Sequence, residues 1–292
     1  MLARWPVKSP LEFWGFILFL LCSLGVYAGG AAGQQAVVPN LFDPRERMTL
    51  PDLSGVDRVR FLTTTDFPPF NFLDQNGRLA GFHVDLARAI CGELGIEPRC
   101  QIQALPWDEL DVAVEAGEGE AIIAGVRVTA ESRQRYAFTR TILGLPARFV
   151  VREEDGGRDK EAVDALEEGA RVGVLQRSAH AAMLRAYFPD LTPIAFTDAS
   201  FLFDALKEGR VAAIFGDGVQ MSFWLGSEDA AECCGFLDGP FLSEEYLGHG
   251  LSIAVSPDLP QLAEAFDYAL LALNENGRFA ELYLRYFPNG LY

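Results

Sequence analysis

The sequence TTTDFPPFNFLDQNGRLAGF, residues 63–82, combines several structural signals in one run. Its Pro68-Pro69 pair follows an apolar segment and predicts a stiff turn, because proline fixes its own backbone torsion. Asn76 and Gly77 lie between apolar residues, which is typical of a tight β-hairpin. The next residues, HVDLA at 83–87, begin an amphipathic helical pattern. The stretch therefore predicts a strand, an aromatic turn, a hairpin and a helix, in that order.

Beyond this stretch, short apolar runs alternate with helical patterns. The expected strands are 59–64, 100–104, 121–125, 149–152, 171–175, 212–215 and 251–256. The expected helices between them are 83–94, 108–115, 179–187 and 200–207, and the last helical stretch, 259–287, is interrupted at Asn276 and Gly277, which predicts two helices. This alternation predicts an α/β protein with open, mostly parallel sheets.

The N-terminus has the pattern of an export signal. Arg4 and Lys8 precede an apolar run at 14–26, and Val26-Tyr27-Ala28 supplies the small residues of a cleavage site. We therefore expect a signal peptide at 1–28, followed by a linker at 29–56. An uncleaved membrane anchor is the alternative, although the apolar run is short for a span.

The chain is acidic, with a formal net charge of −17. Such a chain is not expected to bind nucleic acid, which is recognised largely by neutralising phosphates with basic residues. The length of 292 residues permits one large domain or two lobes of ordinary size. Motifs of hydrolases, zinc proteases, P-loops and dinucleotide-binding folds are absent from the sequence. We expect no catalytic residue, no metal and no cofactor.

Several segments together resemble the polar-amino-acid family of periplasmic solute-binding proteins, family 3. After the opening stretch these are PWDEL at 106–110, AIIAG at 121–125, RVGVLQ at 171–176 and NGRFA at 276–280. The resemblance covers nearly everything after residue 59. It implies a two-lobed type II periplasmic binding protein fold with a discontinuous first lobe and hinge-linked open sheets. The lobes implied are 57–145 with 245–292, and 146–244, with crossings near 144–147 and 241–247.

In open α/β sheets, ligands bind beyond the carboxyl ends of strands, where the candidate residues of the first lobe lie. The resemblance implies that Phe67 and Trp107 form apolar walls of a ligand site, although core packing explains either residue as well. Related proteins use an arginine to bind the ligand carboxylate at the position of Ser132. Here Arg127 lies nearer the strand end, and we expect the anion-binding role to have moved to it. The alternative is that Arg127 is a surface charge and that Arg133 partly takes over the anion-binding role.

The second lobe contributes two further candidates. Ser178 follows the run at 171–176 and keeps the hydroxyl that meets the ligand carboxylate in the resembled family, whereas Arg177 replaces the usual glycine. Asp217 matches the family aspartate that pairs with the ligand ammonium, and an ordinary helix cap is the alternative. Relatives that select basic amino acids place a further carboxylate near Thr64, and its absence argues against a ligand of that type.

The cysteines fit an oxidising compartment. Cys91 lies near the end of one expected helix and Cys100 opens the next strand, and some cationic-amino-acid-binding relatives carry a disulfide at a similar place. Cys233 and Cys234 are adjacent and form either a vicinal bridge or two thiols.

The resemblance implies a periplasmic, non-enzymatic substrate-binding component of an ABC transporter. It would capture an amino acid or a related small carboxylate by lobe closure. Its expected partners are the small-molecule ligand and an inner-membrane ABC permease, and it is expected to be a monomer. Two alternatives stay open: a periplasmic accessory protein of a quinoprotein dehydrogenase system, and a cyclohexadienyl dehydratase on the same fold.

Overall fold

A computed structural model describes residues 36–39, 42–43, 45–155, 166–237 and 239–292, all within one compact unit, Ala36–Tyr292. The expected signal peptide at 1–28 lies outside the described residues. Within the described ranges, no helix is both long enough and apolar enough to span a membrane.

The first sheet is mixed and has the strand order β5-β1-β6-β13-β7. Its strands are β1 (Val59–Thr63), β5 (Cys100–Ala104), β6 (Ala121–Ile122), β7 (Ala137–Phe138) and β13 (Ala254–Val255). In β1, Phe61 lies opposite Ile102 of β5 and Ala121 of β6, in parallel pairings. β13 runs antiparallel to both β6 and β7.

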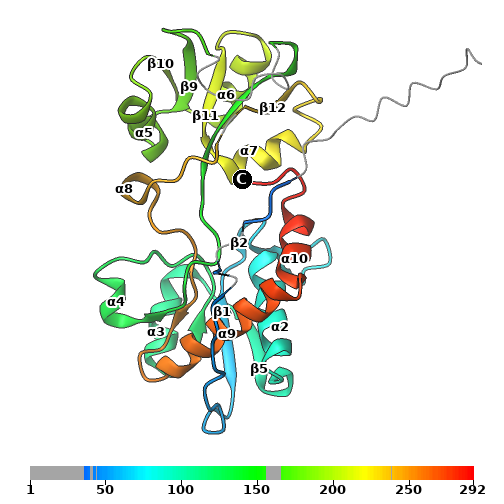
Figure 1. Ribbon diagram of the computed structural model, residues 1–292, viewed down its shortest axis with the longest axis vertical. Helices are drawn as coiled ribbons and strands as arrows, with labels where there is room; N and C mark the ends of the chain where they lie inside the picture. The colour runs from blue at the N-terminus through cyan, green and yellow to red at the C-terminus, as the bar shows by residue number, and fades with distance from the viewer. Residues whose placement is uncertain (1–35, 40–41, 44, 156–165, 238) are drawn as a thin grey trace, which may run out of the picture. The chain divides into compact units, whose positions relative to one another are not determined.

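Helices cover both faces of this sheet. They are α2 (Phe82–Glu93), α3 (Leu110–Glu115), α9 (Pro260–Glu275) and α10 (Arg278–Tyr286). Because successive strand residues point to opposite faces, Phe61 packs with α2, α9 and α10, whereas its neighbour Leu62 packs with α3. Figure 1 shows α2, α9 and α10 beside one another, and the three helices contact each other pairwise. β1 is therefore apolar on both faces, as is typical of a buried parallel strand.

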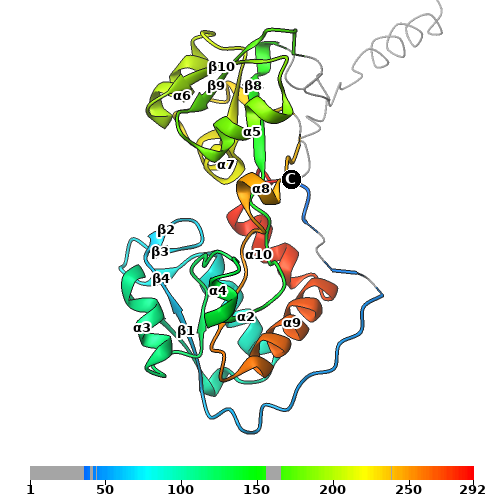
Figure 2. The same cartoon turned by 90° about the vertical axis from the view of Figure 1, so that its left-hand side faces the viewer.

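The second sheet has the order β10-β9-β11-β8-β12. Its strands are β8 (Ala147–Arg152), β9 (Arg171–Leu175), β10 (Thr192–Phe196), β11 (Ala213–Asp217) and β12 (Cys234–Phe236). β10, β9 and β11 are parallel, and β8 and β12 add antiparallel pairings. Its helices are α5 (Ala179–Tyr187), α6 (Ala199–Lys207) and α7 (Gly218–Leu225), seen around the sheet in Figure 2. Phe215 packs with α5, and the preceding Ile214 packs with α6 and α7.

The remaining elements are short. They are the strands β2 (Asp66–Phe67), β3 (Asn71–Leu73) and β4 (Leu79–Ala80), the helices α4 (Ser132–Arg135) and α8 (Glu244–Leu247), and the 3-10 turns η1 (Glu97–Arg99), η2 (Trp107–Glu109) and η3 (Glu153–Asp155). β3 and β4 are antiparallel, and Gly77 between them has φ +71°, so the expected hairpin is confirmed.

The chain passes from the first sheet to the second after β7 and returns after β12. The two passages lie side by side, because Leu143 bridges to Leu251 and Ala147 bridges to Phe241. The first sheet is thus built from segments on either side of the second, and the predicted discontinuous two-lobed fold is confirmed. The lobe boundaries at 145–146 and 244–245 stay predictions.

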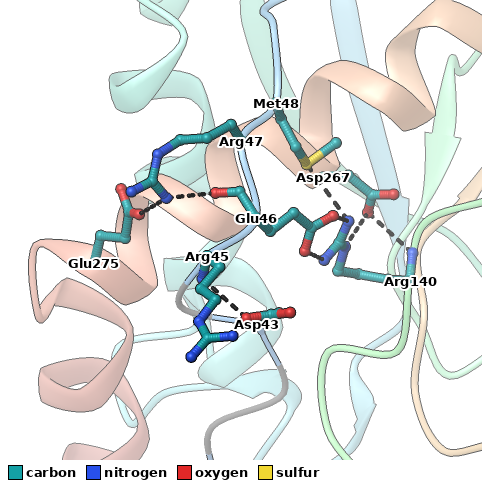
Figure 3. A network of polar contacts seen from close by, with 8 residues as sticks. All are labelled: Asp43, Arg45, Glu46, Arg47, Met48, Arg140, Asp267 and Glu275. Atoms are coloured by element: carbon teal, nitrogen blue, oxygen red, sulfur yellow. Dashed lines mark hydrogen bonds and ion pairs between the residues drawn. The ribbon is translucent and has the colours of Figure 1, made fainter.

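Residues 42–56 belong to the stretch expected as a linker. Where described, they form no helix or strand, yet they bury Phe42, Leu53 and Val56 in the core that contains α9. Figure 3 shows the polar contacts that hold this segment: the Arg140 guanidinium donates to both carboxylate oxygens of Glu46 at 2.7 Å. The Arg140 backbone N–H donates to Asp267 Oδ1 of α9 at 2.9 Å. The segment therefore packs as part of the fold.

Both cysteine pairs are bonded. Cys91 of α2 is joined to Cys100 of β5, whose Cα atoms are 6.2 Å apart, and Cys233 is joined to its neighbour Cys234. The first bridge ties the end of a helix to the following strand, as expected. The second is the vicinal bridge, one of the two alternatives expected for Cys233 and Cys234.

Candidate functional site

The turn after β1 holds two phenylalanine rings against each other. The ring centroids of Phe67 and Phe70 are 4.7 Å apart, with Phe70 buried and Phe67 half-buried. The Phe70 carbonyl accepts the backbone N–H of His83 at 2.8 Å, which fixes the turn to the start of α2. Gly81 is needed here, because it has φ +127° and a Cβ would overlap the Phe70 carbonyl.

A chain of buried hydrogen bonds lies behind this aromatic pair. Asn71 Nδ2 donates to Thr64 Oγ1 at 2.7 Å, so Asn71 Oδ1 is left to accept a hydrogen bond from His83 Nδ1 at 2.8 Å. All three residues are buried, and the His83 ring lies 4.9 Å from the Phe70 ring. Burial lowers the pKa of His83 to about 3, so the imidazole is neutral near pH 7. None of the three side chains in this hydrogen-bonded series is therefore charged near pH 7.

Asp217 stands at the end of β11 and also caps α7. Its Oδ1 accepts the backbone N–H of Gln220 at 2.9 Å, so the helix-cap role considered for it is present. Within the described ranges, no hydrogen bond engages its other carboxylate oxygen, Oδ2. The side chain is half-buried, and its second oxygen is left for another donor.

His180 on α5 is the titratable neighbour of Asp217. Its ring centroid is 6.4 Å from that of Phe215, which precedes Asp217 on β11. Burial lowers the pKa of His180, while the negative charge of Asp217 acts in the opposite direction. Since the ordinary histidine pKa is 6.5, the lowered value leaves His180 mainly neutral at pH 7.

A cavity of about 470 Å³ joins the aromatic turn to Asp217. It is lined by Phe67, Pro68, Phe70, Leu145, Asp217, Val219, Gln220 and Phe223. Two of the five candidates, Phe67 and Asp217, thus line the same space. The sequence did not predict Leu145, Val219 and Phe223, although Val219 lies two residues after Asp217 on an apolar helix, which was a usable signal.

Arg127 lies in the loop after β6 and is exposed. In the part of the chain that the structure describes, its guanidinium has no hydrogen-bond or ion-pair partner. Ser132, at the position where relatives carry the arginine, is buried, and its hydroxyl donates to the Arg127 carbonyl at 2.7 Å. The Ser132 backbone N–H is capped by Thr129 Oγ1 at 3.0 Å. Ser132 therefore shapes the loop that carries Arg127, but Arg127 does not line the cavity.

Ser178 and Trp107 also lie outside the cavity lining. The Ser178 hydroxyl donates to the Leu175 carbonyl at 2.7 Å and accepts the Ala181 N–H at 3.0 Å, so it is occupied as the cap of α5. Arg177 beside it is exposed and has φ +57°. Trp107 begins η2 and is 52% exposed. Within the described ranges, no cluster of three or more His, Cys, Asp or Glu side chains is placed to hold a metal ion.

Two α/β lobes are joined by paired crossings, and the cavity is lined by Phe67, which precedes the first crossing, and Asp217, which follows it; together these features define a two-lobed binding protein. The chain belongs to the bacterial extracellular solute-binding proteins, family 3, which match residues 59–289. That family and the fold were both predicted from the sequence, and both are confirmed.

Curated relatives agree with this assignment, and a solved structure agrees with the fold. The chain is 28% identical over 235 residues to the "Putative ABC transporter arginine-binding protein 2" of Escherichia coli K12, covering 80% of this chain and 92% of that protein. It is 28% identical over 250 residues to the "L-arginine-binding protein" of Pseudomonas aeruginosa PAO1, covering 84% and 93%. The second substrate-binding domain of a putative amino acid ABC transporter from Streptococcus pneumoniae has a TM-score of 0.67 at 23% identity, over 79% of this chain and 100% of that chain.

Proposed function

We propose that this protein is the periplasmic substrate-binding component of an ABC transporter and captures an amino acid or a related small carboxylate. One observation carries the proposal: the cavity between Phe67 and Asp217 offers an aromatic surface and a carboxylate oxygen with no partner among the described residues. The relatives named for arginine binding support an amino acid as the ligand class.

Each candidate residue has a chemical role in this proposal. Asp217 Oδ2 accepts a hydrogen bond from the ligand ammonium, and Phe67 packs against the ligand body. Arg127, which is exposed and unpaired within the described part, grips the carboxylate with its planar guanidinium after the lobes close. The capping bonds occupy the Ser178 hydroxyl, so Ser178 contributes by shaping the start of α5. Trp107 is exposed and serves as an apolar wall in the closed state.

Lobe closure follows from where these groups lie. Arg127 follows a strand of the first sheet, and Asp217 ends a strand of the second. A ligand with both a carboxylate and an ammonium satisfies both only when the lobes approach, so binding shifts the population toward a closed state. The closed complex then delivers its ligand to an inner-membrane permease. The protein acts as a monomer, after removal of residues 1–28, and performs no chemistry on the ligand.

A thermal-shift screen tests this proposal. The purified protein, stripped of bound solute by unfolding and refolding, is screened against amino acids, dicarboxylates, sulfonates and short-chain organic acids. A ligand at 100 times its dissociation constant stabilises a protein by about 2.7 kcal/mol. We expect at least one amino acid or carboxylate to raise the melting temperature.

Variants locate the binding groups. Arg127→Ala and Asp217→Ser are expected to abolish the shift, and serine is chosen because it can still cap α7. Arg171→Ala is the matched control. Arg171 is an exposed arginine at the start of β9, and the candidate residue Ser178 follows the other end of that strand. Silence across the whole panel contradicts the proposal and favours the accessory protein of a dehydrogenase system. Formation of product from arogenate or prephenate contradicts it in favour of the dehydratase.

A further inference from the structure

The lining of the cavity is strongly apolar. Six of its residues have apolar side chains: Phe67, Pro68, Phe70, Leu145, Val219 and Phe223. The polar side chains are Gln220 and Asp217, and in the described part of the chain Asp217 is the one charged group of the lining. A single carboxylate can neutralise a single cationic group of a ligand.

The groups behind the lining add no second anion. Thr64, Asn71 and His83 form the hydrogen-bonded chain beneath the aromatic pair, and none of them carries a negative charge. Thr64 is 3% exposed and its hydroxyl accepts from Asn71, so this wall presents no charged partner to a cation. A cationic side chain that points toward this wall would lose its water without gaining a partner.

Asp217 has one carboxylate oxygen left for the ligand. Its negative charge acts on His180 of α5, whose pKa is lowered by burial. Among the described residues, the Asp217 Oδ1 atom accepts the neutral backbone N–H of Gln220, and Oδ2 has no hydrogen-bond partner. Oδ2 is therefore available to accept a hydrogen bond from one ammonium group of a ligand.

We infer that the cavity selects α-amino acids whose side chains are apolar and uncharged over those whose side chains are cationic. The inference rests on the proposed function and names the ligand class of the same site. The single carboxylate takes the α-ammonium, and the apolar lining takes the side chain. This selectivity separates the chain from the two relatives named above as arginine-binding proteins.

Energetics favour this assignment because burying a charge without a partner is far more unfavourable than burying an apolar group. L-norleucine and L-lysine form a matched pair for the test: both have the same unbranched four-carbon side chain, and lysine adds a terminal ammonium. Any difference in affinity therefore reports on that one charge. We expect L-norleucine to bind at least about 100-fold more tightly than L-lysine, given the cost of an unpaired buried ammonium.

Isothermal titration calorimetry of the purified, ligand-stripped protein at pH 7 measures both affinities. Equal affinities, or tighter binding of lysine, overturn the inference. Binding of a cationic amino acid or a dicarboxylate from the panel, with every apolar amino acid silent, also overturns it while leaving the proposed function intact. Silence toward every solute of the panel overturns the proposed function and the inference with it.

A substitution at Phe223 tests the same inference by adding affinity for lysine. Phe223 lines the cavity but is 48% exposed, so replacing it does not empty the core. Phe223→Glu adds a second carboxylate to the lining. Phe223→Gln introduces an uncharged side chain of the same size as Glu and serves as its control. We expect the ratio of lysine to norleucine affinity to be at least about tenfold higher in Phe223→Glu than in Phe223→Gln, because a second carboxylate can pair with the side-chain ammonium. Equal ratios in the two variants overturn the inference.

Discussion

Replacing Asp267 with Asn is expected to stabilise the protein at pH 7.5 and to change how its stability depends on pH. Asp267 lies on α9 with a side chain only 19% exposed, 3.7 Å from Arg140 Nε (Figure 3). Burial raises its pKa to about 6, against the lowering effect of the hydrogen bond from the Arg140 backbone. The charged form is therefore disfavoured in the folded protein relative to the unfolded chain.

The sign follows from proton binding. Between the ordinary pKa of 3.8 and the folded value of about 6, the folded state binds more protons than the unfolded state. Stability from this group is therefore fully present below pH 3.8 and is lost as pH rises through 6. Two pKa units correspond to at most about 3 kcal/mol, and partial solvent contact reduces this to roughly 1 to 2 kcal/mol. In Asp267→Asn the amide oxygen can still accept the Arg140 N–H, so the hydrogen bond at 2.9 Å is retained.

Urea unfolding at pH 4.5 and 7.5 measures the effect. We expect Asp267→Asn to exceed the wild type by about 1 kcal/mol at pH 7.5 and to lose most of that advantage at pH 4.5. Asp258→Asn is the control, because Asp258 is exposed just before α9. The quantity compared is the difference in free energy of unfolding between variant and wild type. His83 makes stability depend on pH in the opposite direction over an overlapping range, and its contribution cancels in this difference. A variant less stable than the wild type at pH 7.5, with an unchanged difference at pH 4.5, refutes the reasoning.

Other substitutions test the remaining parts of the structure. Phe42→Ala is expected to lower the free energy of unfolding by roughly 3 kcal/mol, because Phe42 is 5% exposed, and a loss below about 1 kcal/mol in urea unfolding contradicts its packing. The pair Cys91→Ala and Cys100→Ala removes a bridge with a sequence separation of 9 and is expected to cost about 2 to 3 kcal/mol, measured against the oxidised wild type. The His83 pKa is lowered from 6.5 to about 3, so its contribution to stability is lost as pH falls through this range; His83→Gln is expected to flatten that fall, and an unchanged slope contradicts it.

Long periodic segments made most of the fold predictable. The run at 171–175 is β9, and the expected break at Asn276 and Gly277 separates α9 from α10, where Gly277 has φ +80°. β10 was missed because Pro193 argues against a strand, but β10 is an edge strand, where a missing N–H is tolerated. β12 has the sequence CGF and is too short to show a period.

The site was predictable only in part. Phe67 and Asp217 each follow a recognisable strand, and they line one cavity. Leu145 lies in the crossing and Phe223 on α7, and no local pattern indicates that these segments meet Phe67. The hydroxyls of Ser132 and Ser178 are used by their own loops, which depends on backbone geometry that a sequence does not display.

Small-angle X-ray scattering with and without the best ligand of the panel tests most directly whether this protein captures a solute by closing its lobes. We expect saturating ligand to reduce the radius of gyration of the wild type, because the ligand must join Arg127 and Asp217. Asp217→Ser, at the same ligand concentration, is expected to show no reduction. A ligand that binds the wild type without any change in the radius of gyration, or an equal change in both proteins, contradicts the account.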